Sequence, residues 1–378
     1  MRQNPLEIPE LFDRFIRLVA QKPEDPTDLD IADLQACSLV AHSWAHVAQS
    51  QLFRAPVHTN PSFSYKSSVV AKFSEALTSS PHLLEHVRQL RLDYRELPPD
   101  CLEKLSKHSF HHLQSLLLLI GNDSQTSPPP NAFPQPSALP MLRHLSLQIA
   151  GPFSLLGPIV QQFPPTIQHL SLFCIAWDTE GPSSDIASTT PLIQLKSARL
   201  NMWDNGNFRW FPPHRRLSSY PFDFSQLKAL AIRYASSIEW SAICTDKIEI
   251  LDLHVRDEGT AVDLTAFPNL RILRFDIDRH HIPPIVAATL ATITSDHEIH
   301  TVIISVGEGP TAQAGYIELD RILSSVQMPA IPAVEFQHKF KNAPNFAAFF
   351  PTLFANNLFH VVSYNFTRQR WQELVDTL

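Results

Sequence analysis

A short hydrophobic pattern recurs along most of the chain. Each copy has an apolar residue, two variable residues, a second apolar residue, one variable residue and a third apolar residue. The middle apolar positions are Leu90, Leu116, Leu145, Leu170, Ala198, Leu230, Leu251, Leu273, Val302, Val334 and Val362. The ten steps between these positions average about 27 residues, which indicates an array of repeated structural units.

Each copy predicts a short β-strand. Side chains alternate across a strand, so the last two apolar residues of a copy point into the molecule while the residue between them points the other way. One such strand cannot bury its apolar edge alone, so neighbouring repeats stack and form a parallel sheet. Pattern and period together are the signature of leucine-rich repeats, and the predicted fold class is α/β, an irregular leucine-rich-repeat solenoid (horseshoe) with parallel strands. The alternative, a doubly wound α/β sheet, would need far more than 9 glycines and longer helices between strands.

Three short helices are predicted before the repeats. The first follows Pro9, which suits the first turn of a helix, and the third is capped by Ser43. Their apolar stripes consist of Leu11, Phe12, Phe15, Ile16 and Val19, then Ile31, Leu34, Cys37 and Val40, then Trp44, Val47, Ala48 and Leu52. Leu39 falls off the second stripe, so we expect this small unit to cover its spare apolar surface with a partner.

The same helices resemble an F-box of the form common in fungal proteins. The resemblance covers most of residues 6–54, with Pro-Glu-Leu at 9–11, Cys-Ser-Leu-Val-x-x-Ser-Trp at 37–44 and a closing Leu-Phe pair at 52–53. It implies an N-terminal three-helix F-box domain, predicted as residues 1–56, in front of a leucine-rich-repeat-like domain of residues 57–378. The alternative is a helical cap on the domain that follows.

The resemblance also implies a function. F-box proteins are substrate-recognition subunits of SCF-type cullin–RING E3 ubiquitin ligases, in which the F-box docks on the Skp-type adaptor and through it on the cullin. The repeats would then bind a target protein that the sequence does not identify. The residues that match the motif, and that we expect to contact the adaptor or support the contact, are Pro9, Leu11, Ile16, Leu34, Cys37, Val40 and Trp44. The alternative is a non-enzymatic leucine-rich-repeat interaction scaffold with no ubiquitin-ligase link.

The variable positions of the predicted strands indicate what the concave face of the solenoid presents. Arginine and histidine recur there, although the chain is acidic overall. The hypothesis is that this face binds an acidic or phosphorylated segment of another protein through charge-assisted hydrogen bonds. The candidate target-binding residues are Arg91, His144, His169, Arg199, Arg233, His254 and Arg274. Ordinary solubilising charge is the alternative interpretation.

Three segments interrupt or end the repeats. Residues 122–140 are rich in Pro, Ser and Gln and predict a solvated loop, with an SH3 or WW ligand as the less favoured alternative. Residues 204–223 combine aromatic and arginine side chains, a composition typical of interface hot spots, although the aromatics could instead fold back onto the solenoid edge. Within residues 365–378, Thr367 could cap a helix that we expect to cover the last repeat. The apolar residues of that helix are Trp371, Leu374 and Leu378.

Composition and charge narrow the class of protein. Of the 378 residues, 44% are hydrophobic and 18% are charged, which is a globular composition. A net charge of −7 with scattered basic residues predicts no nucleic-acid partner. The 4 cysteines are far apart in the sequence, which favours a reducing compartment. With no secretory signal and no apolar run of about 18 residues, we expect a soluble protein of the cytoplasm and/or nucleus with no membrane partner.

The sequence contains no recognisable catalytic motif: there is no G-x-S-x-G, no G-x-x-x-x-G-K and no H-E-x-x-H. Gly307-Glu308-Gly309 begins like a dinucleotide-binding loop, but the third glycine is missing and Pro310 lacks a backbone N–H. His42 and His46 have a metal-capable spacing without a nearby cysteine or carboxylate partner. We therefore expect no catalytic residue, no metal and no cofactor.

Overall fold

The computed structural model describes residues 14–16, 31–40, 42–54, 67–94, 99–121, 136–150, 159–160, 162–176, 193–204, 222–233, 243–255, 261–277, 284–306, 313–325, 333–338, 346–356, 358–363, 371 and 375. The chain divides into two compact units, Met1–Ile167 (unit 1) and Gln168–Leu378 (unit 2). The predicted domain boundary between residues 56 and 57 lies in the stretch 55–66, outside the described residues, and stays a prediction. The same holds for most of the two predicted loops, 122–140 and 204–223.

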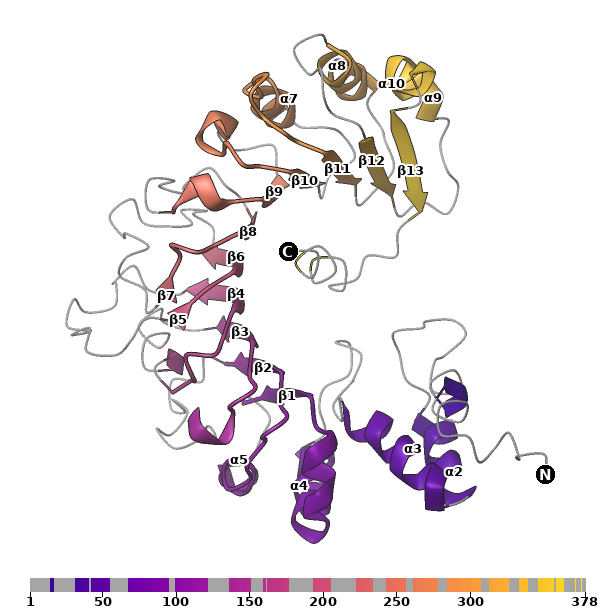
Figure 1. Ribbon diagram of the computed structural model, residues 1–378, viewed down its shortest axis with the longest axis vertical. Coiled ribbons are helices and arrows are strands. Elements are labelled where there is room, and N and C mark those ends of the chain that lie inside the picture. The colour runs from indigo at the N-terminus through magenta and orange to yellow at the C-terminus, as the bar shows by residue number, and fades with distance from the viewer. Residues whose placement is uncertain are drawn as a thin grey trace, which may run out of the picture. The chain divides into compact units, whose positions relative to one another are not determined.

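Unit 1 begins with helices and continues with the first strands of the repeat array (Figure 1). Its elements are α2 (Ile31–Val40), α3 (His42–Arg54), α4 (Ser67–Ser79), η2 (Pro81–His86), β1 (Gln89–Asp93), α5 (Pro99–Ser106), β2 (Ser115–Ile120), η3 (Pro136–Ala138) and β3 (His144–Ala150). A further helical stretch is described at residues 14–16. The cap predicted at Ser43 is wrong, because α3 begins at His42 and Ser43 therefore lies in its first turn.

The N-terminal helices enclose a small apolar core. Ile16, Leu34, Cys37 and Ala48 are buried together, and partly buried residues of α3 pack against them. Leu34 and Cys37 lie three positions apart, as the predicted stripe of the second helix requires, so that stripe is confirmed for both of them. Leu39, which falls off the stripe, is 86% exposed.

The strands of unit 1 confirm the predicted repeat register. β1, β2 and β3 are parallel neighbours, and Leu90 is paired with Leu116, which is paired with Leu145. All three leucines are buried. Because the register aligns the middle position of each copy, every other residue of these strands is aligned as the pattern predicts.

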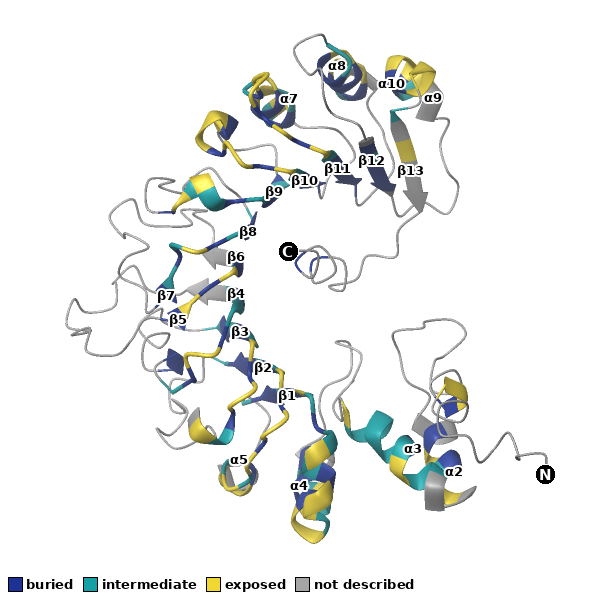
Figure 2. Ribbon diagram, in the orientation of Figure 1, coloured by how far each residue is buried: buried dark blue, intermediate teal, exposed yellow. Residues whose placement is uncertain are grey.

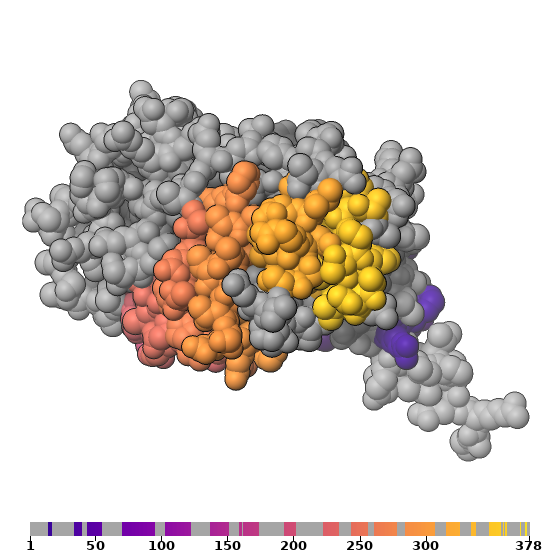
Figure 3. Space-filling view, turned by 90° about the horizontal axis from the view of Figure 1, so that it is seen from above, coloured from indigo at the N-terminus to yellow at the C-terminus, as the bar shows by residue number. Residues whose placement is uncertain are grey.

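Unit 2 continues the array with short helices between successive strands (Figure 1). Its strands are β4 (His169–Ala176), β5 (Ile193–Gln194), β6 (Ser197–Asp204), β7 (Phe222–Asp223), β8 (Ala229–Arg233), β9 (Ile250–Val255), β10 (Ile272–Ile277), β11 (Thr301–Val306), β12 (Ala333–His338) and β13 (Phe359–Ser363). Its helices are η8 (Thr245–Lys247), η9 (Leu264–Ala266), α7 (Pro284–Leu290), α8 (Gln313–Leu323), α9 (Phe346–Phe349) and α10 (Pro351–Ala355). In Figure 3 the described residues of unit 2 follow one another in colour order from orange to yellow, as stacked repeats should.

The parallel sheet of unit 2 has the order β4-β6-β8-β9-β10-β11-β12-β13, and β5 and β7 form a separate parallel pair. The middle positions of seven copies are aligned from strand to strand, each one paired with the next. These positions are Leu170, Ala198, Leu230, Leu251, Leu273, Val302 and Val334. The sequence pattern therefore predicts both the strands and their register without a gap from β4 to β12.

The last copy of the pattern is the exception. We expected Val362 to align with Val334, but Val334 is paired with Phe359, and Val362 is paired with Gln337. The shift of three residues reverses the parity of the strand, so Phe359 and Val361 take the places predicted for Val362 and Tyr364. An apolar residue occurs at Phe359, Val361 and Val362 alike, so the pattern alone does not distinguish the two registers.

The two faces of the unit 2 sheet differ in what covers them. The back face carries the apolar positions of the pattern, and on β12 Phe336 packs with Tyr316 of α8 and with Phe350, at ring-centroid distances of 6.2 Å and 5.4 Å. The same turn recurs just before two of the strands. The N–H of Leu227 donates to the carbonyl of Phe224 at 3.2 Å, and the N–H of Leu270 donates to the carbonyl of Phe267 at 3.1 Å. The front face carries the variable positions and corresponds to the predicted concave face. Among the residues coloured in Figure 2, those of the strands are mostly buried, while the helices have exposed sides.

Candidate protein-binding surfaces

The first candidate surface lies on the N-terminal helices. Leu39 on α2 is 86% exposed and Phe15 is 48% exposed, while Trp44 on α3 is partly buried. The rings of Phe15 and Trp44 are in contact, with centroids 5.6 Å apart. We call Phe15, Leu39 and Trp44 the N-terminal apolar surface. Large apolar residues exposed on so small a helical unit make these helices a candidate interaction surface.

The structure changes the roles expected of the adaptor-binding residues. Ile16 and Leu34 are fully buried and Cys37 is 8% exposed, so these three side chains form the internal core and can support a contact only from beneath. Trp44 is the predicted residue that reaches the surface. Pro9 and Leu11 lie outside the described residues, as does the side chain of Val40.

Sequence reasoning missed Phe15 as a surface residue because it assigned Phe15 to the buried stripe of the first helix. The neighbouring Ile16 occupies the core instead, and Phe15 lies partly exposed against Trp44. Phe15 and Ile16 are adjacent and both apolar, so the period of the helix alone does not decide which of them is buried. For Leu39, by contrast, the sequence does predict exposure, because Leu39 lies off the apolar stripe of the second helix.

Helix α3 also packs on the start of the repeat array, within unit 1. The ring of His46 meets that of His86 of η2 edge-on at 5.0 Å, and Phe53 stacks on Phe73 of α4 at 6.3 Å. The carbonyl of Arg54 accepts a 3.0 Å hydrogen bond from the N–H of Arg88. Burial, followed by the charges of His46 and Arg88, lowers the pKa of His86. These contacts join the N-terminal helices to the first strand of the array.

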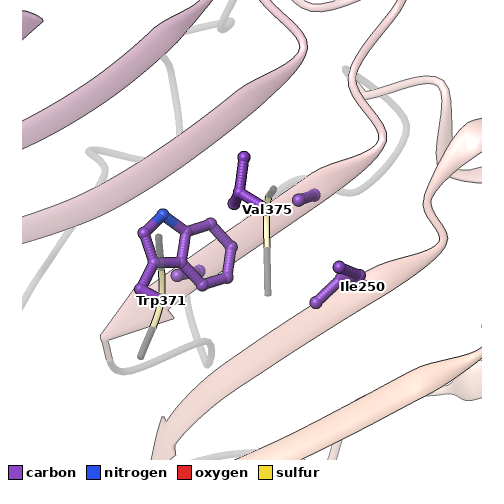
Figure 4. Close-up of a cluster of buried hydrophobic side chains, with 5 residues drawn as sticks. Ile250, Trp371 and Val375 are labelled. Atoms are coloured by element: carbon purple, nitrogen blue, oxygen red, sulfur yellow. The ribbon is translucent and has the colours of Figure 1, made fainter. Parts of the chain in front are cut away.

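The second candidate surface is an apolar area on the front face of unit 2. Ala229, Ala231 and Ile250 are buried there, and Ile272 is partly buried beside them. We call these four residues the alanine shelf. Trp371 and Val375, from the C-terminal end of the chain, are 8% and 4% exposed and pack on the shelf (Figure 4). Both residues are in helical conformation and four positions apart, so they lie on one side of a helical turn.

This packing corrects the prediction that the C-terminal helix covers the last repeat. Trp371 lies on residues of β8 and β9, in the middle of the sheet of unit 2, and not on β13. Leu374 and Leu378, the other two predicted contacts, lie outside the described residues. The helical periodicity of the segment predicts an apolar stripe but carries no information on which surface that stripe meets.

A polar ladder continues from the shelf across four strands of the front face. The guanidinium of Arg274 donates from Nη1 to Oδ2 of Asp252 at 2.9 Å and from Nη2 to Oγ of Ser305 at 3.2 Å. Ser305 donates to Oε1 of Gln337 at 2.8 Å, and Gln337 donates to Oε1 of Glu335 at 2.7 Å. The Arg274 and Asp252 side chains are only 5% and 6% exposed. The ladder therefore links these buried polar groups to one another, although Oδ1 of Asp252 is buried without a hydrogen-bond partner.

The pKa of Asp252 is raised, chiefly by burial of its carboxyl group. The charges of Arg274 and Arg199 oppose this increase, and the nearby Asp276 adds to it. Next to Asp252, Nδ1 of His254 lies 3.2 Å from Oδ2 of Asp276. The charged side chains of this face therefore interact with one another: Asp252 with Arg274, and Asp276 with His254.

The candidate target-binding residues fall into separate groups. Arg91 and His144 belong to β1 and β3 of unit 1 and are partly buried. In unit 2, Nδ1 of His169 lies 2.9 Å from Oγ of Ser197, and His254 lies against Asp276. Arg199 and Arg233 are partly exposed. Arg274, by contrast, is buried and paired with Asp252, so its side chain is not exposed to a partner in this structure.

The charge of the front face also differs from the expectation of a basic surface. Among the described residues on the front face of β6 to β12, Arg199, Arg233 and Arg274 are matched by an equal number of acids. Those acids are Asp252, Asp276 and Glu335. An acidic segment would therefore gain no net attraction from the fixed charges of this part of the sheet. The signal was present in the sequence, since the same register that aligns Arg274 also aligns Asp252 with it.

Comparisons with known proteins do not assign the chain to a family. No protein-family model matches the sequence, and no curated protein matches it. Among solved structures, a crystal structure of an internalin from Listeria monocytogenes aligns with a TM-score of 0.34 and 12% identity, over 94% of this chain and 95% of that chain. Similarity at this level identifies neither a family nor a function.

Other sites for chemistry are not found in the part of the chain that the structure describes. No three histidine, cysteine or acidic side chains gather there in a way that could hold a metal ion. A cleft of about 470 Å³ between α7 and α8 is lined by Ala287, Leu290 and Ile293 on one side and by Glu318 and Ile322 on the other. In the described part of the chain, no helix is long and apolar enough to cross a membrane. The two candidate surfaces described above therefore carry the functional argument.

Proposed function

We propose that the chain is a substrate-recognition subunit of an SCF-type cullin–RING E3 ubiquitin ligase. The N-terminal helices dock a Skp-type adaptor, which joins the chain to the cullin, and the repeat sheet binds the target protein. On this proposal the chain catalyses nothing; it raises the effective concentration of target lysines near the conjugating enzyme. Such a protein works in the cytoplasm and/or the nucleus.

The N-terminal apolar surface is the observation that carries the proposal. The unit has an internal core of its own in Ile16, Leu34 and Cys37, yet leaves Leu39 86% exposed and Phe15 48% exposed. A residue exposed to this extent contributes little to folding, and a large exposed apolar side chain is a candidate for burial in an interface. The sequence block at 37–44 that resembles an F-box spans Leu39 and Trp44.

The test is a single substitution, Leu39→Asp, in the full chain. We expect the affinity for a purified Skp-type adaptor to fall by more than about tenfold, because a carboxylate would be buried at an apolar contact. Since Leu39 is exposed, the free energy of unfolding should change by no more than about 0.5 kcal/mol. Ile317→Asp is the matched control: Ile317 is also an exposed apolar helix residue, 49% exposed on α8, and should leave adaptor binding unchanged.

Affinity purification followed by mass spectrometry asks the same question in cells. Adaptor and cullin should be recovered with the native chain and with the Ile317→Asp variant, and should be lost with Leu39→Asp. Equal recovery with all three chains, or recovery with none, would contradict the proposal.

A second function is favoured by the other end of α3. A leucine-rich-repeat interaction scaffold without a ligase link would use the N-terminal helices only to cover the start of the array. The contacts of Phe53 with Phe73 and of Arg54 with Arg88 are what such a cap requires. The scaffold does not need Leu39 to be apolar, so normal target binding with no adaptor binding by the native chain would select it.

A further inference from the structure

The alanine shelf differs from the rest of the front face of unit 2 in the size of its side chains. In strand register, Ala229 lies between Ser197 and Ile250, and Ala231 lies between Arg199 and Asp252. Two small side chains on one strand therefore stand between larger neighbours on both sides. A bulky side chain placed over β8 meets less steric resistance there than over β9 or β10, and Trp371 occupies this position.

The shelf is also chemically distinct from its surroundings. Ala229, Ala231 and Ile250 are apolar, whereas the next positions along the face belong to the polar ladder that begins at Asp252 and Arg274. An apolar area bordered by ion-paired groups takes a ligand that is apolar on one side only. A helical turn with an aromatic residue and a β-branched residue four positions later meets this requirement, as Trp371 and Val375 do.

The sheet has a core that does not depend on this segment. Leu230, Leu251 and Leu273 are fully buried on the back face, on the side of the sheet opposite Trp371 and Val375. Of the C-terminal segment, the described contribution to the front-face cluster is these two side chains. Because each repeat is stabilised mainly by its neighbours, the repeats do not need this segment in order to stack.

We propose that the front face of unit 2 is a site for an amphipathic helical segment with an aromatic residue followed four positions later by a β-branched aliphatic residue. Trp371 and Val375 of the same chain fill this site until a partner segment of that chemistry displaces them. The inference rests on the part of the proposed function that assigns target binding to the repeat sheet. It does not depend on adaptor docking.

The covalent link between the C-terminal segment and the sheet determines how strongly this segment competes with a partner for the shelf. A segment joined to its site through a short linker acts at an effective concentration on the order of millimolar, so a free partner must bind tightly or be present in excess. Target binding by the intact chain would then be weaker than by a chain whose own segment has been removed. The C-terminal segment is in this sense an autoinhibitory contact.

The experiment uses the full chain with a protease site introduced at residues 364–366, so that the repeats fold before the tether is cut. After cleavage, a fluorescent peptide of residues 367–378 is added. We expect the labelled peptide to replace the cleaved fragment, and to bind at least about tenfold more weakly to the uncut chain, in which the tethered segment competes. A peptide carrying Trp371→Ala should bind at least about tenfold more weakly than the native peptide to the cut chain.

A variant of the shelf tests the location of the site. Ala231→Glu in the cut chain should abolish binding of the labelled peptide, because it places a carboxylate on the shelf. The matched control is Ala288→Glu on α7, where the alanine is exposed and remote from the shelf in the repeat array. This control should bind the peptide as the native sequence does.

Two results would overturn the inference. In the first, the cleaved fragment leaves only when the whole sheet unfolds, which would make the segment a permanent part of the core. In the second, the peptide binds the Ala231→Glu and native chains equally. Adaptor affinity measured on the same chains separates this inference from the F-box proposal, because loss of adaptor binding in Leu39→Asp leaves peptide exchange unaffected.

Discussion

The N-terminal helices and the sheet of unit 2 treat their apolar surface in opposite ways. Among the described residues of the helices, four form a buried core, and Leu39 and Phe15 are exposed. The sheet buries nearly every described apolar side chain on its back face, and its one described apolar area on the front face is covered by Trp371 and Val375. The first region therefore leaves apolar side chains open to a partner, whereas the second already has an occupant from the same chain.

The front face of unit 2 also carries buried polar groups. On the front face of unit 2, Arg274 is buried and donates hydrogen bonds to both Asp252 and Ser305. Such a ladder contributes little net stability relative to apolar residues of the same shape, but it penalises any change to a single member. The comparison thus predicts large effects in the sheet and selective effects in the helices.

The largest expected effect is that of Arg274→Met. It leaves the Asp252 carboxylate buried without its cation, and we expect the free energy of unfolding to fall by about 3–5 kcal/mol. Urea denaturation of the full chain measures this change. The control is Arg321→Met, because Arg321 pairs with Glu318 on the surface of α8 and should matter by less than about 0.5 kcal/mol.

A second substitution sharpens that result. Asp252→Asn combined with Arg274→Met removes both charges, so much of the lost stability should return. If the double variant is no more stable than Arg274→Met, the loss came from packing of the arginine stem and not from the unpaired carboxylate.

The next effect compares two leucines on the same helix, α2. Leu34→Ala should destabilise the N-terminal helices by about 2–5 kcal/mol, because it opens a cavity among Ile16, Cys37 and Ala48. Leu39→Ala should change stability by less than about 0.5 kcal/mol while weakening adaptor binding. Thermal unfolding monitored by circular dichroism gives the first quantity and titration with adaptor the second. Similar destabilisation by both changes would mean that Leu39 is not a free surface residue.

The comparison of Leu34 with Leu39 also shows which substitution tests adaptor docking without disturbing the fold. A charged residue at position 34 would disrupt the internal core, so loss of adaptor binding in that variant would report unfolding as much as a lost contact. A charged residue at position 39 changes the surface alone.

The smallest effect is a pH dependence at the junction of α3 and η2. The pKa of His86 lies below its ordinary value of 6.5, so the folded state binds this proton less readily than the unfolded state does. The stability that neutral His86 provides is therefore present above about pH 6.5 and is lost as the pH falls through the lower folded-state pKa. His86→Gln should flatten the pH dependence of the thermal midpoint, whereas His111→Gln, in an exposed turn, should not.

The fold could be predicted from the sequence wherever the alternation of side chains across a strand determines which residues are buried. The spacing of the apolar residues fixes the faces of a strand, and the aligned middle positions from Leu170 to Val334 then follow from stacking. The same rule fails at β13, because apolar residues at Phe359, Val361 and Val362 satisfy either register.

The candidate surfaces were less predictable, because they depend on contacts between distant parts of the chain. An amphipathic pattern marks Trp371 as apolar but does not reveal that it meets Ala229 and Ala231. The pairing of Arg274 with Asp252 follows from register, yet reading arginines alone made the front face look basic. Adjacent apolar residues such as Phe15 and Ile16 are separated only by packing.

Amide hydrogen exchange of the full chain, with and without saturating Skp-type adaptor, tests the central claim most directly. Adaptor docking on the N-terminal apolar surface should slow exchange in α2 and α3 and leave β9 unchanged, because the shelf is covered from within the chain. Exchange in α2 and α3 that is the same with and without adaptor would contradict the account.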